Sequence, residues 1–174
     1  EGAVRRAFPR HDVAVRLFGS CAYGLDVASS DLDLVVVRWA APGTSDDRRH
    51  ATYVLHRLAQ FLRATPHVRV DRVLDRATVP VVRATVAGAP PVQVDLSLEC
   101  ATHTGLAAAA LGRALVERLP ALAPAAVAVR ALLRRAGLND AYTGGLPSYA
   151  VLLMLFYATL RPDEAAARDP NRRR

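Results

Sequence analysis

The spacing of apolar residues changes near His103, and this change constrains the fold more than any other feature of the sequence. Before it, short apolar runs predict strands at residues 13–18, 32–37, 68–73, 79–86 and 92–98. A helix capped by Ser45 or Asp46 interrupts them, and apolar residues then recur at helical spacing over 105–119, 121–136 and 147–160. Strands followed by helices indicate an α+β fold, with a mixed sheet and flanking helices in residues 1–103 and the start of a helical second domain in residues 104–174.

The composition suits a folded protein with a polyanionic partner. Apolar residues make up 52% of the chain, which is too many for a disordered segment. The formal charge of +7 favours RNA, DNA, a nucleoside triphosphate or an anionic membrane, and composition does not choose among these. Arginine supplies all of this charge and lysine is absent, which indicates a GC-rich genome rather than a particular compartment.

The sequence leaves the compartment open. Cys21 and Cys100 have neither metal-ligand spacing nor the pattern of a disulfide scaffold, so a reducing compartment is the default. The most apolar run, residues 150–160, has about half the length that crosses a bilayer, so we expect a buried helix and no membrane partner. Because the chain begins with Glu1 and ends in three arginines, we expect a piece of a longer protein, whether nuclear, cytoplasmic or mitochondrial.

Two carboxylates and a glycine turn form the most informative pattern. Alternate residues of a strand point to the same face, so Asp31 and Asp33 present two like charges side by side. Such a pair is tolerated when a cation lies between its members, and hard oxygen ligands select Mg²⁺ or Mn²⁺. Upstream, the turn at Gly19-Ser20 offers backbone N–H groups and a hydroxyl to a phosphate. Alone, each feature is more often a solvated strand end or a simple turn.

A third carboxylate is expected from Asp95, the one acid in the alternating strand of residues 92–98. Three acids on neighbouring strands suit phosphoryl transfer with two Mg²⁺ (or Mn²⁺) ions. One ion activates an attacking 3′-hydroxyl and the other neutralises the leaving pyrophosphate. Asp95 is expected to contact the metal at the attacking oxygen.

In this order, Gly19-Ser20, Asp31-x-Asp33 and a later Asp95 resemble the DNA polymerase β-like nucleotidyltransferase superfamily. Phe18-Gly19-Ser20 with Tyr23-Gly24, and residues 77–82 as a likeness of the motif "ARVPII", are similar to its poly(A) polymerase and terminal uridylyltransferase branch. The resemblance implies a catalytic palm domain over residues 1–103 and an incomplete central helical domain over residues 104–174. It also implies transfer of AMP or UMP from ATP or UTP to an RNA 3′ end without a template.

The helical half carries further positions of this resemblance. Arg130 and Arg134 lie four residues apart on one expected helix face, where the family has basic residues that contact the triphosphate. Residues 144–154 are similar to the family motif "GxLSSYxLxLM". By that resemblance Ser148 touches the triphosphate and Tyr149 stacks on the base, a contact that tolerates several bases. The expected site therefore lies between the sheet and the helices.

One departure from the family opens an alternative. The Asn-Thr pair that holds the ribose and triphosphate in the family falls here on Ala108 and Ala109, which can do neither. The second hypothesis is therefore a weak or inactive homologue that serves as an RNA-binding or scaffold subunit of an RNA-processing or ribonucleoprotein assembly. A third is another branch of the superfamily that modifies a small molecule or protein. The choice between ATP and UTP, the RNA and the protein partners remain open.

Overall fold

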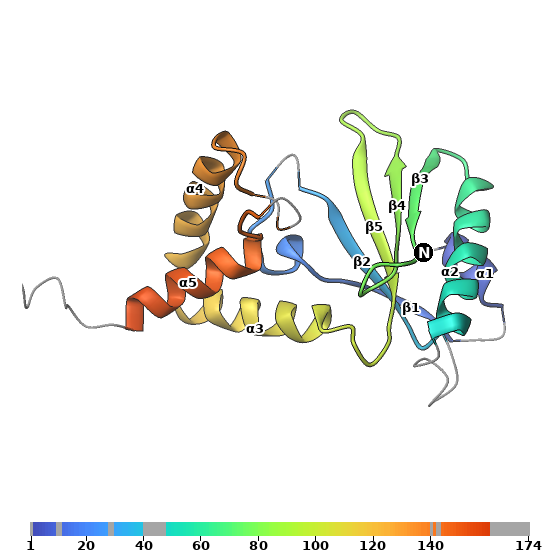
Figure 1. Ribbon diagram of the computed structural model, residues 1–174, viewed down its shortest axis with the longest axis horizontal. Coiled ribbons are helices and arrows are strands. Elements are labelled where there is room, and N and C mark those ends of the chain that lie inside the picture. Colours follow the sequence, from blue (N-terminus) through green and yellow to red (C-terminus); the bar gives the residue numbers. More distant parts are fainter. Residues whose placement is uncertain are drawn as a thin grey trace, which may run out of the picture. The chain divides into compact units, whose positions relative to one another are not determined.

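The structure is a computed structural model that describes residues 2–9, 12–27, 30–39, 48–139, 141 and 144–160 (Figure 1). Its contacts divide the chain into two compact units, which we call unit 1 (Glu1–Leu111) and unit 2 (Gly112–Arg174). The domain division expected between residues 103 and 104 stays a prediction.

Unit 1 is built on a five-stranded mixed sheet. Along the chain its elements are α1 (Gly2–Ala7), β1 (Ala14–Leu17), the 3-10 helix η1 (Ser20–Tyr23), β2 (Leu32–Val37), α2 (Arg48–Arg63), β3 (Val68–Leu74), β4 (Val81–Val86) and β5 (Val92–Leu98). The strand order is β1-β2-β5-β4-β3, in which β2 and β5 run parallel and all other neighbours antiparallel. The expected α+β class with a mixed sheet is confirmed.

One face of the sheet is covered by α1 and α2, which lie side by side (Figure 1). Val36 of β2, Leu96 of β5 and Val82 of β4 belong to the same buried cluster as Leu55 and other α1 and α2 residues. Because side chains alternate along a strand, the residues next to these point to the opposite face. The other face of β2, β5 and β4 therefore carries Asp33, Asp95 and Arg83, together with apolar residues such as Val35.

The helix α1 was not predicted from the sequence. It has six residues, too few to be stable alone, and it forms here because Ala3, Val4 and Ala7 are buried in the cluster shared with α2. The helix α2 was predicted, but its expected caps, Ser45 and Asp46, lie outside the described residues. The absence of a strong local signal explains why α1 was missed.

The described residues of unit 2 lie mostly in helices. The division between the units falls within α3 (Gly105–Arg118), and α4 (Leu122–Arg135) and α5 (Ser148–Leu160) follow. The α4 residues Leu122 and Ala126 are buried, as are Val151 and Leu152 of α5. Within the part of the chain that the structure describes, no helix has both the length and the apolar character needed to cross a membrane.

Candidate active site

Two of the three predicted acids are direct neighbours on the sheet. Asp33 of β2 and Asp95 of β5 are partners in the parallel register, and both alternate with core residues, so they share the face away from α1 and α2. Asp31 lies two residues before Asp33, just ahead of β2. The structure thus brings Asp33 and Asp95 together and places Asp31 at the near end of the same strand.

The electrostatics of Asp33 show that this face carries an excess of negative charge. The pKa of its carboxyl is raised from the usual 3.8 to about 6, first by burial and then by the charges of Asp95 and Asp31, while Arg83 opposes them. A group whose charged form is disfavoured by burial and by like charges is stabilised by a nearby cation. The acid cluster therefore offers oxygen ligands and unbalanced charge to a cation.

A cation from the chain itself already contacts one of these acids. The Arg83 guanidinium on β4 donates two hydrogen bonds to Asp95, of 2.9 Å to Oδ1 and 2.7 Å to Oδ2. The two residues are register partners across the β4–β5 hairpin. Arg83 was not predicted from the sequence, although counting back from the turn at Gly88–Pro91 places it opposite Asp95.

The three acids are the type of ligand that a hard divalent cation prefers, but their side chains are not arranged as a metal site in this structure. Carboxylate oxygens are the ligands that Mg²⁺ prefers, and the raised pKa of Asp33 is what a bound cation would relieve. Among the described residues, however, no group of three or more His, Cys, Asp or Glu side chains is placed to hold a metal ion. In this arrangement the guanidinium of Arg83 engages both oxygens of Asp95.

The backbone of Gly19 lies directly against Asp33. Gly19 has φ 65° and ψ −163°, a region that is essentially restricted to glycine. A Cβ at this position would overlap the Asp33 carboxylate and lie 2.7 Å from its Cγ. Ser20 then begins η1, and the amide of Phe18 is bonded to the Asp33 carbonyl at 3.0 Å. The predicted Gly-Ser turn is thereby held beside the acid cluster.

His103 packs against the same region. Its Nε2 lies 2.9 Å from the Ser97 hydroxyl, and its ring meets Phe18 edge-on at 4.9 Å between centroids. A Cβ at Gly105 would lie 2.5 Å from a Phe18 ring carbon and 2.8 Å from His103. Burial lowers the pKa of His103. His103 is therefore packed against the strand and turn that carry the predicted site, as a neutral side chain near neutral pH.

The remaining predicted positions belong to α3 and unit 2. Ala109 is buried in α3 and Ala108 is half-buried. Arg130 and Arg134 lie one turn apart on α4, with Arg134 exposed and Arg130 half-buried. Ser148 and Tyr149 begin α5 and are both half-buried. The helical spacing and the helix start are as predicted, and the contacts of these residues with a nucleotide stay a prediction.

Residues 1–111 match the family described as "Poly(A) RNA polymerase, mitochondrial-like, central palm domain". Over 163 residues the chain is 30% identical to poly(A) RNA polymerase cid14 of Schizosaccharomyces pombe, covering 92% of this chain and 22% of that protein. It is 32% identical to the inactive poly(A) RNA polymerase protein Trf4-2 of Drosophila melanogaster, covering 82% of this chain and 33% of that protein.

Among solved structures, terminal uridylyl transferase 4 from Trypanosoma brucei with bound GTP superposes with a TM-score of 0.74 at 26% identity. The match covers 91% of this chain and 49% of that one. The chain thus spans about a fifth to a third of the two curated relatives (22% and 33%) and about half of the structural neighbour.

Proposed function

The chain belongs to the family of mitochondrial-like poly(A) RNA polymerase central palm domains, and from that premise we propose that it is part of a template-independent RNA nucleotidyltransferase. The observation that carries the proposal is the pairing of Asp33 with Asp95 on parallel neighbouring strands, with the Gly19 backbone against Asp33. The relatives named as poly(A) RNA polymerase and terminal uridylyl transferase support the same reaction class.

In this proposal Asp31, Asp33 and Asp95 hold two Mg²⁺ (or Mn²⁺) ions. When bound, the ions activate the RNA 3′-hydroxyl and neutralise the charge of the leaving pyrophosphate. The chain's own part is to fix the carboxylates. Asp33 and Asp95 are set by the β2–β5 register, and the close approach of Gly19 limits where the Asp33 carboxylate can turn.

Arg83 must share or release Asp95 for that carboxylate to act as a ligand. Its two hydrogen bonds use one acceptor position on each oxygen of Asp95. A divalent cation brings more charge than a guanidinium and is favoured by the same acids. We therefore assign Arg83 the role of a counter-charge that orients Asp95 before the metal binds.

The proposed nucleotide contacts are Gly19 and Ser20 in unit 1, and Arg130, Arg134, Ser148 and Tyr149 in unit 2. Arg130 and Arg134 supply positive charge from one face of α4, and Ser148 offers a hydroxyl at the start of α5. Tyr149 offers a ring for base stacking, a contact that every base can make. The substrate is ATP or UTP with an RNA 3′ end.

A second candidate function is favoured by two observations. The chain resembles a relative named as inactive, and the positions of the family's Asn-Thr pair are occupied by Ala108 and Ala109. A chain that keeps its acids but has lost these nucleotide contacts would act as an RNA-binding or scaffold subunit of a larger RNA-processing assembly.

An extension assay separates the two candidates. The parent protein, an Asp31→Ala, Asp33→Ala double variant and an Asp12→Ala control receive end-labelled RNA, Mg²⁺ and one nucleoside triphosphate at a time. Asp12 is 85% exposed and outside the acid cluster, so its replacement should leave extension intact. We expect the parent and the control to lengthen the RNA, the double variant to fail, and the productive nucleotide to name the activity. No extension by the parent, with Mn²⁺ substituted as well, would favour the second candidate.

A further inference from the structure

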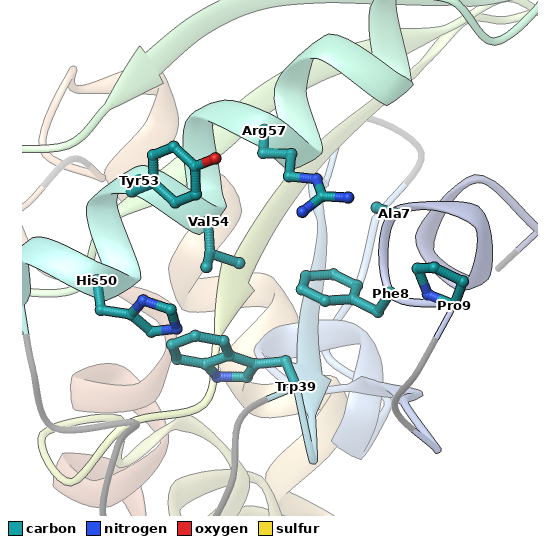
Figure 2. Close-up of a pocket in the computed structure, with 8 residues that line it drawn as sticks. All are labelled: Ala7, Phe8, Pro9, Trp39, His50, Tyr53, Val54 and Arg57. Atoms are coloured by element: carbon teal, nitrogen blue, oxygen red, sulfur yellow. The ribbon is translucent and has the colours of Figure 1, made fainter.

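A pocket lies on unit 1 away from the acid cluster. Its cavity, of about 400 Å³, is lined by the end of α1 and the two residues after it, by Trp39 beyond the end of β2, and by α2 (Figure 2). We call it the aromatic pocket and define it by six of its lining residues: Phe8, Trp39, His50, Tyr53, Val54 and Arg57. Its volume is within the range of pockets that take small organic groups.

The pocket has a buried apolar floor and a polar, aromatic rim. Phe8, Trp39 and Val54 are at most 8% exposed and form the floor. The indole N–H of Trp39 donates to the Glu99 carbonyl at 2.7 Å, which fixes the plane of the ring. On the rim, the Tyr53 side chain is 65% exposed. An aromatic residue this exposed, above a buried aromatic floor, indicates a surface that receives a planar group.

Helical spacing on α2 aligns the rim. His50, Tyr53, Val54 and Arg57 are spaced at three, four and seven residues and therefore share one helix face. In Figure 2 the side chains of His50, Val54 and Arg57 extend toward Trp39 and Phe8, and the Tyr53 ring lies across α2. The His50 ring is stacked on Trp39, with 5.6 Å between centroids and 20° between planes. The pocket therefore already contains one stacked pair of rings, His50 on Trp39, and the Arg57 guanidinium also lines it.

The charge of α1 and α2 indicates which class of ligand this surface can bind. The sequences of α1 and α2 contain arginines and histidines but no Asp or Glu, although the chain as a whole has 16 acidic residues. A basic surface that carries exposed aromatic rings matches the chemistry of a single-stranded nucleic acid, whose phosphates need cations and whose bases stack on aromatic side chains. An apolar or proline-rich peptide would have no need of the charge.

We propose that the aromatic pocket binds a segment of single-stranded RNA upstream of the 3′ end, with a base against Tyr53 and His50 and a phosphate at Arg57. The inference rests on the proposed function, since it takes the RNA substrate as the ligand. The pocket lies on the α1–α2 side of the sheet and at the far end of β2 from Asp31. Trp39 lies six residues after Asp33, so their Cα atoms are at most about 20 Å apart. An RNA that occupies both places must therefore be several nucleotides long.

The test measures how the affinity for RNA depends on RNA length and on the Tyr53 side chain. Fluorescence anisotropy is measured with labelled oligoadenylates of about 4 and about 16 nucleotides, which bracket the usual site sizes for single strands. The proteins are the parent, Tyr53→Ala, Tyr53→Phe and Tyr157→Ala, the last a control at an exposed tyrosine of unit 2. We expect Tyr53→Ala to weaken binding of the longer RNA about tenfold and leave the shorter unchanged. Tyr53→Phe and Tyr157→Ala should bind like the parent.

Two further measurements test whether the RNA binds at the aromatic pocket. Trp39 is the single tryptophan of the chain, so the longer RNA should change the tryptophan emission of the parent and change that of Tyr53→Ala less. Arg57→Ala should reduce the slope of log affinity against log salt by about 0.7, the value for one phosphate contact on a single strand. A change in emission with a proline-rich peptide but not with RNA would overturn the proposal in favour of a peptide groove.

The same proteins separate this inference from the proposed function. If the parent extends RNA while Tyr53→Ala binds the longer RNA as tightly as the parent, the aromatic pocket is not an RNA site and the proposed function stands. If the parent adds no nucleotide but Tyr53→Ala still weakens binding of the longer RNA, the RNA site stands and the proposed activity fails. Salt-independent binding that Arg57→Ala leaves unaltered would also overturn the assignment of the phosphate contact.

Discussion

Replacing Asp33 with asparagine should stabilise the metal-free protein at neutral pH. The pKa of Asp33 is raised from 3.8 to about 6, so the folded protein binds this proton more tightly than the unfolded chain does. Stability is therefore lost as the pH rises from about 4 to 6, and the loss is complete above that window. At 1.36 kcal/mol per pH unit, the displacement corresponds to about 3 kcal/mol. Water that reaches this half-buried carboxylate reduces the effect, and we expect about 1–3 kcal/mol.

Asparagine has the shape of the aspartate and no charge, so the variant isolates this electrostatic contribution. The free energy of unfolding is measured by urea titration in EDTA at pH 7.5 and at pH 3.5. Asp33→Asn should be more stable than the parent at pH 7.5 and nearly equal to it at pH 3.5, where Asp33 is mostly protonated in both states. Mg²⁺ should stabilise the parent and have little effect on the variant.

Asp71→Asn provides a control of opposite sign. Its pKa is lowered, first by the hydrogen bond from Thr85, so loss of its charge should not stabilise the protein at pH 7.5. The reasoning is wrong if Asp33→Asn is no more stable than the parent at pH 7.5, or if the difference persists unchanged at pH 3.5. Either result would mean that ionisation of Asp33 does not lower the free energy of unfolding.

Two further changes test the surroundings of the acids. Arg83→Gln removes the guanidinium that engages both oxygens of Asp95, so Mn²⁺ measured by titration calorimetry should bind about tenfold tighter, or about 1.4 kcal/mol; unchanged or weaker binding would contradict the counter-charge role. Gly19→Ala forces alanine into a glycine-only backbone region and should cost about 1–3 kcal/mol from the backbone alone, with further loss of extension activity because its Cβ meets Asp33. Gly24→Ala is the matched control, since Gly24 is left-handed but has open space around its Cβ position. It should lose about 1–2 kcal/mol of stability and keep its activity, and equal losses of activity in both variants would refute the role of the Gly19 contact.

The strands and acids could be predicted from the sequence because their signals are local. Alternation of side chains along a strand is enough to place Asp31 and Asp33 on one face at the start of β2, and Asp95 on the same face of β5 as Gln93 and Ser97, whichever strands neighbour them. The helix α4 is likewise specified by apolar spacing, which puts Arg130 and Arg134 on one face before any packing is known. A period of two or of 3.6 residues depends only on residues close in sequence.

Tertiary structure alone decided which strands became neighbours and what their side chains meet. The parallel pairing of β2 with β5 brings Asp33 beside Asp95 across 62 residues of chain, and it leaves Arg83 against Asp95. The aromatic pocket joins Phe8, Trp39 and Tyr53 from three separate segments, one of them a helix too short to be predicted. Such contacts are set by the burial of a common core, which favours one arrangement of the whole chain and is not encoded in any single segment.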